Sequence, residues 1–260
     1  MSVVERPDGC RLLVEERGPT TGPPLALLEG MGGSLPGWRR NLPQLAARCR
    51  VIAHDARGNG RSTVPDAPVS MTTFVEDLVA VLDAVGVGEA HLYGQSFGGM
   101  VAIELALTHP DRVRSLILAC THAGLGRASR VEPPVRVRKD APHLVLYAER
   151  FAAEHPEHVA EDVRAWAGHR QRPHARRRQW EAMQAFDAWD RLGEIHRPTL
   201  VLHGTEDRVV AVENARRLAG AIAGAELVLL EGAGHVLHSE RPEEVDASVL
   251  AFVQRVEGAA

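Results

Sequence analysis

The stretch His91-Leu92-Tyr93-Gly94-Gln95-Ser96-Phe97-Gly98-Gly99-Met100 decides the fold of this 260-residue chain. An apolar run at 90–93 predicts a strand, and the small and apolar residues of 100–107 predict a helix. Between the two lies the pattern G-x-S-x-G, at residues 94–98. A strand that turns sharply into a helix leaves no room for side chains beside its central residue. Glycines therefore flank a serine whose hydroxyl is exposed at the helix N-terminus, where the helix dipole favours negative charge.

Strand and helix patterns alternate on both sides of this turn. Further strands are predicted at 3–5, 12–15, 24–28, 50–54, 113–119, 199–202 and 226–230, the first two as a hairpin. Further helices are predicted at 38–47, 71–85, 212–222 and 242–256. This alternation predicts an α/β fold with a mostly parallel, doubly wound sheet and helices on both faces. Ligand sites in such sheets lie at the carboxyl ends of the strands.

The alternation stops between residues 121 and 196. Amphipathic helices are predicted there at 149–151, 155–166 and 179–192, joined by Pro- and Arg-rich segments. We predict that 121–196 is a helical cap inserted into a core formed by 1–120 and 197–260. Five arginines and His174 lie within 170–178, which favours a solvated cap surface. The alternative is recognition of an anionic group on a substrate, which arginine does well.

An acid and a histidine follow two of the later strands. Asp207 comes after the strand at 199–202, and His235 comes after the strand at 226–230. Ser96 alone fits a structural serine in a turn, but these partners at matching places favour a nucleophile. The chain order Ser96, Asp207, His235 is the order of the triad in α/β-hydrolases.

Several linked motifs resemble the α/β-hydrolase family over nearly the whole chain. The motifs are Asp-Ala-Arg-Gly-Asn-Gly-Arg-Ser at 55–62, Gly-Gln-Ser-Phe-Gly-Gly-Met at 94–100 and Gly-Ala-Gly-His at 232–235. Within that family they resemble the branches of 3-oxoadipate enol-lactonase-like enzymes and small esterases. The resemblance implies an α/β-hydrolase fold with a helical cap insertion.

The residue types assign the catalytic roles. Ser96 is the predicted nucleophile, His235 its general base and later its general acid, and Asp207 the group that orients His235. The resemblance implies two backbone N–H donors for the oxyanion, from Phe97 and from Met31. Removing one such donor typically costs about 10²–10³ in kcat. No cofactor or metal is expected.

Glu29 departs from the family pattern, because His-Gly usually opens the oxyanion loop and this chain has Glu29-Gly30. One interpretation is that Glu29 replaces a structural side chain and hydrogen-bonds within the loop. The other is that a carboxylate there opposes an oxyanion and favours a non-hydrolytic reaction such as proton abstraction or cyclisation.

Other residues have weaker assignments. The predicted substrate pocket contains Glu29, Gly30, Trp38, Met100, Trp166 and Trp189. Glu206 is the alternative acid. The alternative base is His238, which is more typical of a surface or a lid contact. Satisfied core histidines are expected at 54, 91 and 203, and no grouping of carboxylates and histidines has the spacing of a metal site.

The leading hypothesis is a serine hydrolase that cleaves a small or medium carboxylic ester or lactone through an acyl-enzyme. Two alternatives stay open. The first is carbon–carbon bond hydrolysis, cofactor-free perhydrolysis or a cyclase or lyase step with the same triad. The second is a non-catalytic protein that binds a small ligand.

Composition bounds the partners and the compartment. A net charge of −4 disfavours nucleic acid and anionic membranes as partners, which leaves a small-molecule substrate. Three widely spaced cysteines are expected to be reduced, buried thiols. With no apolar signal core at the N-terminus and no apolar run that could span a bilayer, we expect a cytoplasmic protein.

Overall fold

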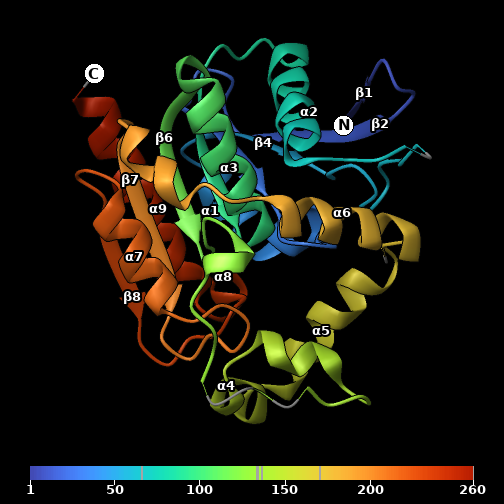
Figure 1. The fold of residues 1–260 in the computed structure, drawn as a ribbon, viewed down its shortest axis with the longest axis vertical. Helices are drawn as coiled ribbons and strands as arrows, with labels where there is room; N and C mark the ends of the chain where they lie inside the picture. Colours follow the sequence, from blue (N-terminus) through green and yellow to red (C-terminus); the bar gives the residue numbers. More distant parts are fainter. Residues whose placement is uncertain (66, 133–134, 136, 170, 260) are drawn as a thin grey trace.

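The computed structural model describes residues 1–65, 67–132, 135, 137–169 and 171–259 (Figure 1). Within these residues, eight strands form one sheet in the order β1-β2-β4-β3-β5-β6-β7-β8. The strands are β1 Ser2–Glu5, β2 Arg11–Arg17, β3 Pro24–Leu28, β4 Arg50–His54, β5 Ala90–Gln95, β6 Val113–Ala119, β7 Thr199–Gly204 and β8 Glu226–Leu230. Strands β3 to β8 pair in parallel, whereas β1 and β2 are antiparallel. Every predicted strand is present, and the mostly parallel sheet is confirmed.

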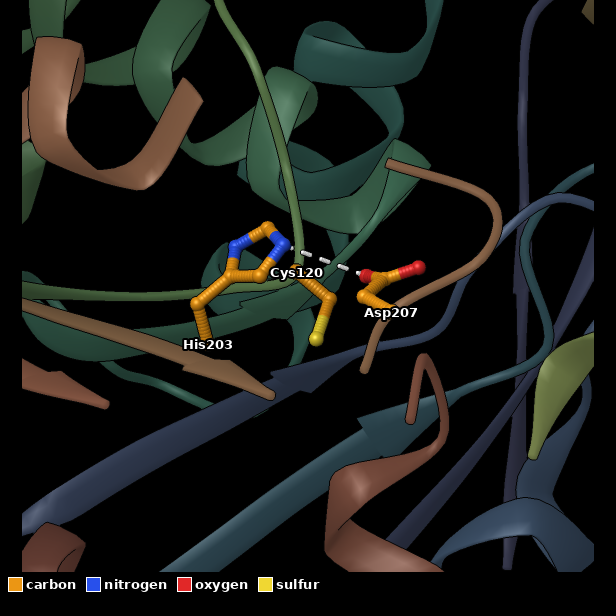
Figure 2. Close-up of side chains that lie close together, drawn as sticks. All are labelled: Cys120, His203 and Asp207. Carbon is orange, nitrogen blue, oxygen red and sulfur yellow. Dashed lines mark ion pairs between the residues drawn. The ribbon is translucent and has the colours of Figure 1, made fainter. Parts of the chain in front are cut away.

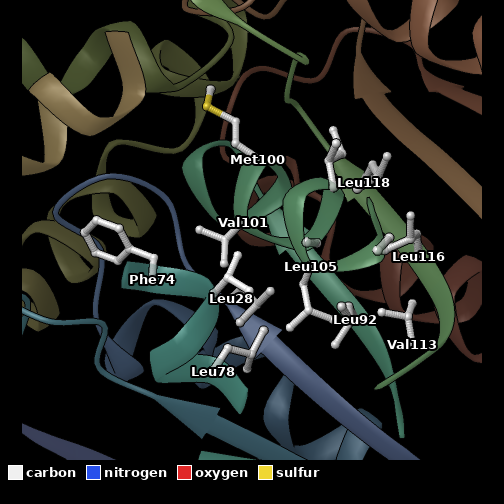
Figure 3. Packing of buried hydrophobic residues seen from close by; sticks show 14 of the residues in the cluster. Leu28, Phe74, Leu78, Leu92, Met100, Val101, Leu105, Val113, Leu116 and Leu118 are labelled. Atoms are coloured by element: carbon white, nitrogen blue, oxygen red, sulfur yellow. The ribbon is translucent and has the colours of Figure 1, made fainter. Parts of the chain in front are cut away.

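Helices cover both faces of the sheet. They are α1 Leu42–Ala46, α2 Met71–Ala84, α3 Phe97–Thr108, α4 Glu149–Glu154, α5 Pro156–Ala167, α6 Pro173–Ala185, α7 Glu213–Ala221, α8 Leu237–Glu240 and α9 Pro242–Gly258. On one face, α2 and α3 bury apolar side chains against β3, β5 and β6, including Phe74, Leu92 and Leu105 (Figure 3). On the other face, α1 and α9 pack against the same strands. The central strands are therefore apolar on both sides, as their continuous apolar runs predict.

Two predicted helices have wrong limits. The helix expected at 38–47 is split into the 3₁₀ helix η1 Leu35–Arg40 and the short α1, each with a proline in its first turn. Proline starts a helix well but cannot continue one, because its ring removes the backbone N–H. The helix expected at 179–192 instead begins at Pro173 and ends at Ala185. It ends there because the carboxylate of Asp187 accepts the N–H of Trp189 and Asp187 pairs with Gly124.

The segment between β6 and β7 contacts loops at the carboxyl ends of the strands. Its helices α4 and α5 lie at the bottom of the view in Figure 1. Gln179 of α6 contacts the loop after β3, and the carbonyl of Leu146 accepts the N–H of Val236 in the loop after β8 at 3.0 Å. The segment thus lies against the edge of the sheet where ligand sites are expected. None of the described helices combines the length and the apolar character that a membrane span needs.

Candidate active site

Ser96 lies in a strained turn between β5 and α3. Its φ of 51° and ψ of −114° are unusual for a residue with a side chain. The flanking glycines make this possible, because a Cβ on Gly94 would collide with the backbone of Gly98, and a Cβ on Gly98 with the carbonyl of Leu28. Ser96 itself is partly exposed, while Gln95 and Phe97 are buried. The turn therefore presents the Ser96 side chain at the carboxyl end of the sheet, as predicted.

His235 and Asp207 form a buried pair, with the Nδ1 atom of His235 2.8 Å from Oδ2 of Asp207. The other oxygen of Asp207 accepts the backbone N–H groups of Val209 and Val210, at 2.8 and 2.9 Å. Burial alone would raise the pKa of Asp207, but the charge and the hydrogen bond of His235 and the nearby imidazole of His203 outweigh it. They hold the pKa well below its usual range. Asp207 therefore stays ionised and fixes the orientation of His235.

The three predicted residues are brought to the same edge of the sheet. The side-chain amide of Gln95, next to Ser96, donates to the carbonyl of His235 at 3.2 Å. On the other side, a Cβ on Gly30 would lie 3.4 Å from Cβ of Ser96. The serine turn thus contacts both the loop after β3 and the loop that carries His235. Met31 is held in a turn by the hydrogen bond from Gly33 N–H to the Gly30 carbonyl, 3.0 Å long.

The carboxyl group of Glu29 points into its own loop. Its Oε2 atom accepts the N–H of Gly30 at 3.1 Å, and the carboxyl group packs against Gly33 and Gly37. Oε1 is buried with no hydrogen-bond partner among the described residues. Burial raises the pKa of Glu29 to about 8, the charge of Asp55 adds to the rise, and the Gly30 N–H opposes it. Glu29 is therefore mostly neutral at pH 7, which favours the structural interpretation of this residue.

Glu29→Gln will stabilise the protein at pH 9 and have little effect below pH 4.5. A carboxyl whose folded pKa is raised from 4.5 to about 8 contributes stability that is fully present below pH 4.5 and is lost progressively as the pH rises to about 8. The variant does not lose it, so its free energy of unfolding should exceed that of the wild type by on the order of 5 kcal/mol at pH 9. Urea unfolding at pH 4.5 and 9 measures it, with Glu231→Gln as a control at an exposed position. A difference that stays constant with pH would show that Glu29 does not titrate in this range.

A second histidine shares Asp207. The Nε2 atom of His203 lies 2.9 Å from the Val210 carbonyl and 3.2 Å from Oδ2 of Asp207 (Figure 2). His203 is fully buried, as the sequence predicts, but its contact with the acid was not predicted.

Cys120, His203 and Asp207 have ligand atoms within 4.8 Å of one another, which is close enough to hold a metal ion. Their chemistry fits a hydrogen-bonded cluster better. Burial raises the pKa of the Cys120 thiol well above its usual range, so it is not a thiolate. Nε2 of His203 carries the proton that the Val210 carbonyl accepts, and Oδ2 of Asp207 accepts from His235. We therefore infer that Cys120 and His203 support Asp207 and do not bind a metal ion.

Three further residues near His235 were missed. His122 lies in the loop that follows β6 and is buried. Burial is the main cause that lowers its pKa to about 4, and the charge of His235 lowers it further. Glu240 is buried and accepts the N–H groups of Gly234 and Ala148, each at 3.1 Å. Gln95 holds the His235 carbonyl. The position of His122 after a central strand was a usable signal; the contacts of Glu240 and Gln95 are set by tertiary structure.

The alternative catalytic residues lie elsewhere. His238 is not at the surface as expected, because it is buried in α8 with its ring 4.8 Å from that of Trp38. Burial lowers its pKa to about 4. Glu206 is exposed and makes no side-chain contact with His235 comparable to that of Asp207. The structure thus favours Asp207 and His235 over both alternatives.

The aromatic residues predicted for the pocket are spread over three clusters. Trp38 is buried against Tyr93 and His238, which favours core packing over a pocket wall. Trp166 packs near Tyr147 in the small core of the inserted segment. Trp189 donates its Nε1–H to the Gly124 carbonyl at 3.0 Å, and Met100 belongs to the core on the α3 face.

The arginine-rich stretch lies mostly on the surface of α6. Arg172, Arg176 and Arg177 are exposed, as is His174. Arg178 donates to the carbonyl of Pro65. Arg170 lies outside the described residues. This placement fits the solvated surface that the charge pattern favours.

Comparisons with known proteins identify the family of the chain. A family profile described as the alpha/beta hydrolase fold matches residues 23–171 and 165–242. RutD of Variovorax paradoxus strain S110, named as a carbamate hydrolase, is 34% identical over 93% of this chain and 96% of its own length. A hydrolase from Pseudomonas aeruginosa PA01 has a TM-score of 0.86 at 34% identity, covering 97% of each chain. The enol-lactonase of Burkholderia xenovorans LB400 has a TM-score of 0.83 at 26% identity, covering 95% of this chain and 97% of its own.

The match in sequence runs over nearly the whole chain and includes the serine turn and the strands that carry Asp207 and His235. The match in structure covers at least 95% of this chain and of each of the two related chains. Both matches agree with the resemblance of the three sequence motifs to the α/β-hydrolase family. The chain therefore belongs to the α/β-hydrolase family and is a hydrolase.

Proposed function

We propose that this protein is a serine hydrolase that cleaves a small or medium carboxylic ester or lactone through an acyl-enzyme. The observation that carries the proposal is the buried His235–Asp207 pair, 2.8 Å between Nδ1 and Oδ2, at the edge of the sheet that presents Ser96. An imidazole held in this tautomer has Nε2 free to accept a proton, which is what a serine hydroxyl needs to become a nucleophile.

The proposed reaction has two halves. Ser96 Oγ attacks the substrate carbonyl while His235 takes its proton, and His235 then returns that proton to the leaving alkoxide. Water attacks the resulting acyl-enzyme with His235 again as base, and the acid is released. The N–H groups of Phe97 and Met31 are the proposed donors to the oxyanion in both halves. The neutral state of Glu29 at pH 7 supports this chemistry, because no fixed negative charge opposes the oxyanion.

The substrate is proposed to bind beneath the segment 121–196, acting as a cap. The contacts of Gln179 with the oxyanion loop and of Leu146 with the histidine loop support this, since the segment contacts both catalytic loops. The three cysteines are free and buried, which supports the proposed cytoplasmic location.

A carbamate ester is the second candidate substrate class. The name of the Variovorax relative favours it, and the same acyl-transfer chemistry applies, because a carbamate also presents a carbonyl bonded to a leaving oxygen. The name of the Burkholderia enzyme favours a lactone instead. A screen of activated esters, lactones and carbamates under one set of conditions separates the classes by kcat/KM.

Labelling with a fluorophosphonate tests the proposal without a known substrate. We expect one adduct per molecule by intact mass, and peptide mapping should place it on Ser96. The reason is that an activated serine displaces fluoride from phosphorus, whereas ordinary serines do not. No adduct on the folded protein, or an adduct on another residue, would contradict the assignment of Ser96.

A further inference from the structure

Residues 30–33 form a turn that includes a glycine in the left-handed region. Gly33 N–H donates to the Gly30 carbonyl at 3.0 Å, which makes Met31 and Gly32 its central residues. Gly32 has φ of 76°, while Met31 is not among the described non-glycine residues with positive φ. A negative φ followed by a positive φ at the two central residues is the pattern of a type II turn. Because glycine adopts either sign of φ, the peptide between Met31 and Gly32 can flip to the type I form at low cost.

A side chain from α6 holds that peptide in one orientation. The Oε1 atom of Gln179 accepts the N–H of Gly32 at 3.2 Å across 147 positions of sequence. A flip would turn the Met31 carbonyl toward Gln179 in place of the Gly32 N–H. The N–H of Met31, the proposed oxyanion donor, belongs to the preceding peptide, which shares the Met31 Cα with the peptide that Gln179 holds. The hydrogen bond therefore selects the type II form.

Two further amides fix Gln179 and complete a ring around the loop. Nε2 of Gln171 donates to Oε1 of Gln179 at 2.6 Å and to Oδ1 of Asn59 at 2.7 Å. Nδ2 of Asn59 then donates to the carbonyl of Gly33 at 2.8 Å. These hydrogen bonds run from the N–H of Gly32 to the carbonyl of Gly33, so they hold two neighbouring residues of the loop.

Packing does not explain a glutamine at this position. Gln179 is 1% exposed, and its Nε2 group is buried without a hydrogen-bond partner among the described residues. Burying an unpaired amide donor costs stability, and a methionine of the same length would fill the space without that cost. The hydrogen bonds that its Oε1 atom accepts explain the glutamine.

We propose that Gln179 is a positioning residue that preorganises the oxyanion loop from the inserted segment, through the N–H of Gly32. Oxyanion donors stabilise a transition state because they are fixed before the reaction, so a loop that flips between two forms stabilises it less. The inference rests on the proposed function. It makes the inserted segment part of the catalytic geometry in addition to a cover over the substrate.

Gln179→Met tests the inference, because it keeps the length of the side chain and removes the acceptor. The rate constant for fluorophosphonate labelling and kcat for 4-nitrophenyl acetate should each fall about 10- to 100-fold, up to the worth of one oxyanion donor, with KM unchanged. Gln184→Met is the matched control, since Gln184 is an exposed residue of the same helix. Equal rates for Gln179→Met and the wild type would overturn the inference.

A double-mutant cycle distinguishes loop geometry from packing. Alanine rarely adopts the φ of 76° that is found at position 32. The Cβ of an alanine there would meet only the end of the Gln171 side chain, at 3.3 Å. Gly32→Ala should therefore cause the same loss as Gln179→Met, and the double variant no more than the larger single loss. Losses that multiply would show that Gln179 acts elsewhere and would overturn the inference.

Amide hydrogen exchange in the wild type needs no variant. The Gly32 N–H lies in a loop outside helices and strands, yet it should exchange slowly because Gln179 holds it. Exchange at the rate of an unstructured peptide would contradict the inference, even if Gln179→Met failed to fold. The two proposals fail separately: an unlabelled wild type contradicts the function, whereas a labelled Gln179→Met at the wild-type rate contradicts only the role of Gln179.

Discussion

Ser96→Ala will lower kcat for an activated ester by about 10⁶-fold and leave the fold unchanged. The variant keeps the hydrogen-bonded pair of His235 and Asp207 and the proposed oxyanion donors, but it lacks the hydroxyl oxygen that would form the acyl-enzyme. Only the acceleration that binding and the oxyanion donors give to direct attack by water should remain. Initial rates with 4-nitrophenyl acetate measure the effect, and the melting temperature checks the fold.

The control for this variant is Ser248→Ala, on α9 and away from the serine turn. It removes a hydroxyl that bonds only to the backbone of its own helix, so full activity is expected. If Ser96→Ala kept more than about one per cent of the activity, the loss would be too small for a nucleophile and would fit a residue that merely binds substrate.

The sheet and the placement of Ser96, Asp207 and His235 at one edge of it could be predicted because their signals are local. Each buried strand is a short apolar run, and the turn at Ser96 needs glycine on both sides whatever surrounds it. Chain order then placed Asp207 and His235 after separate strands, and a parallel sheet brings such positions to one edge. These two residues lie within hydrogen-bonding distance in the structure, and no further sequence signal is needed to predict that they meet.

The contacts of the inserted segment could not be predicted in the same way. Gln179 lies 147 positions from Gly32, and no sequence pattern links a glutamine on an exposed, arginine-rich helix to a glycine loop. The end of α6 is set by Asp187 and its pairing with Gly124, again across the fold. Glu29 departs from the family pattern in the sequence itself, but the direction of its carboxyl group depends on the space beside Gly33 and Gly37.

Asp207→Asn will lower kcat by about 10⁴-fold while the protein stays folded. The orientation of the new amide is fixed by the backbone: the N–H groups of Val209 and Val210 both donate to Oδ1 of Asp207. The amide oxygen of asparagine must stay there, so its NH₂ group takes the place of Oδ2 and faces Nδ1 of His235.

That NH₂ group donates to Nδ1 and leaves the proton of the imidazole on Nε2, so His235 can no longer accept the proton of Ser96. The new NH₂ group also faces the N–H of His203, which still donates to the Val210 carbonyl. The rate of fluorophosphonate labelling should fall with kcat, because both need the same base. Glu206→Gln is the matched control, since it makes the same carboxylate-to-amide change at the exposed neighbour and should leave activity unchanged. A reversal, with Glu206→Gln impaired and Asp207→Asn active, would transfer the role of the acid to Glu206 and contradict the buried pair as the source of the activity.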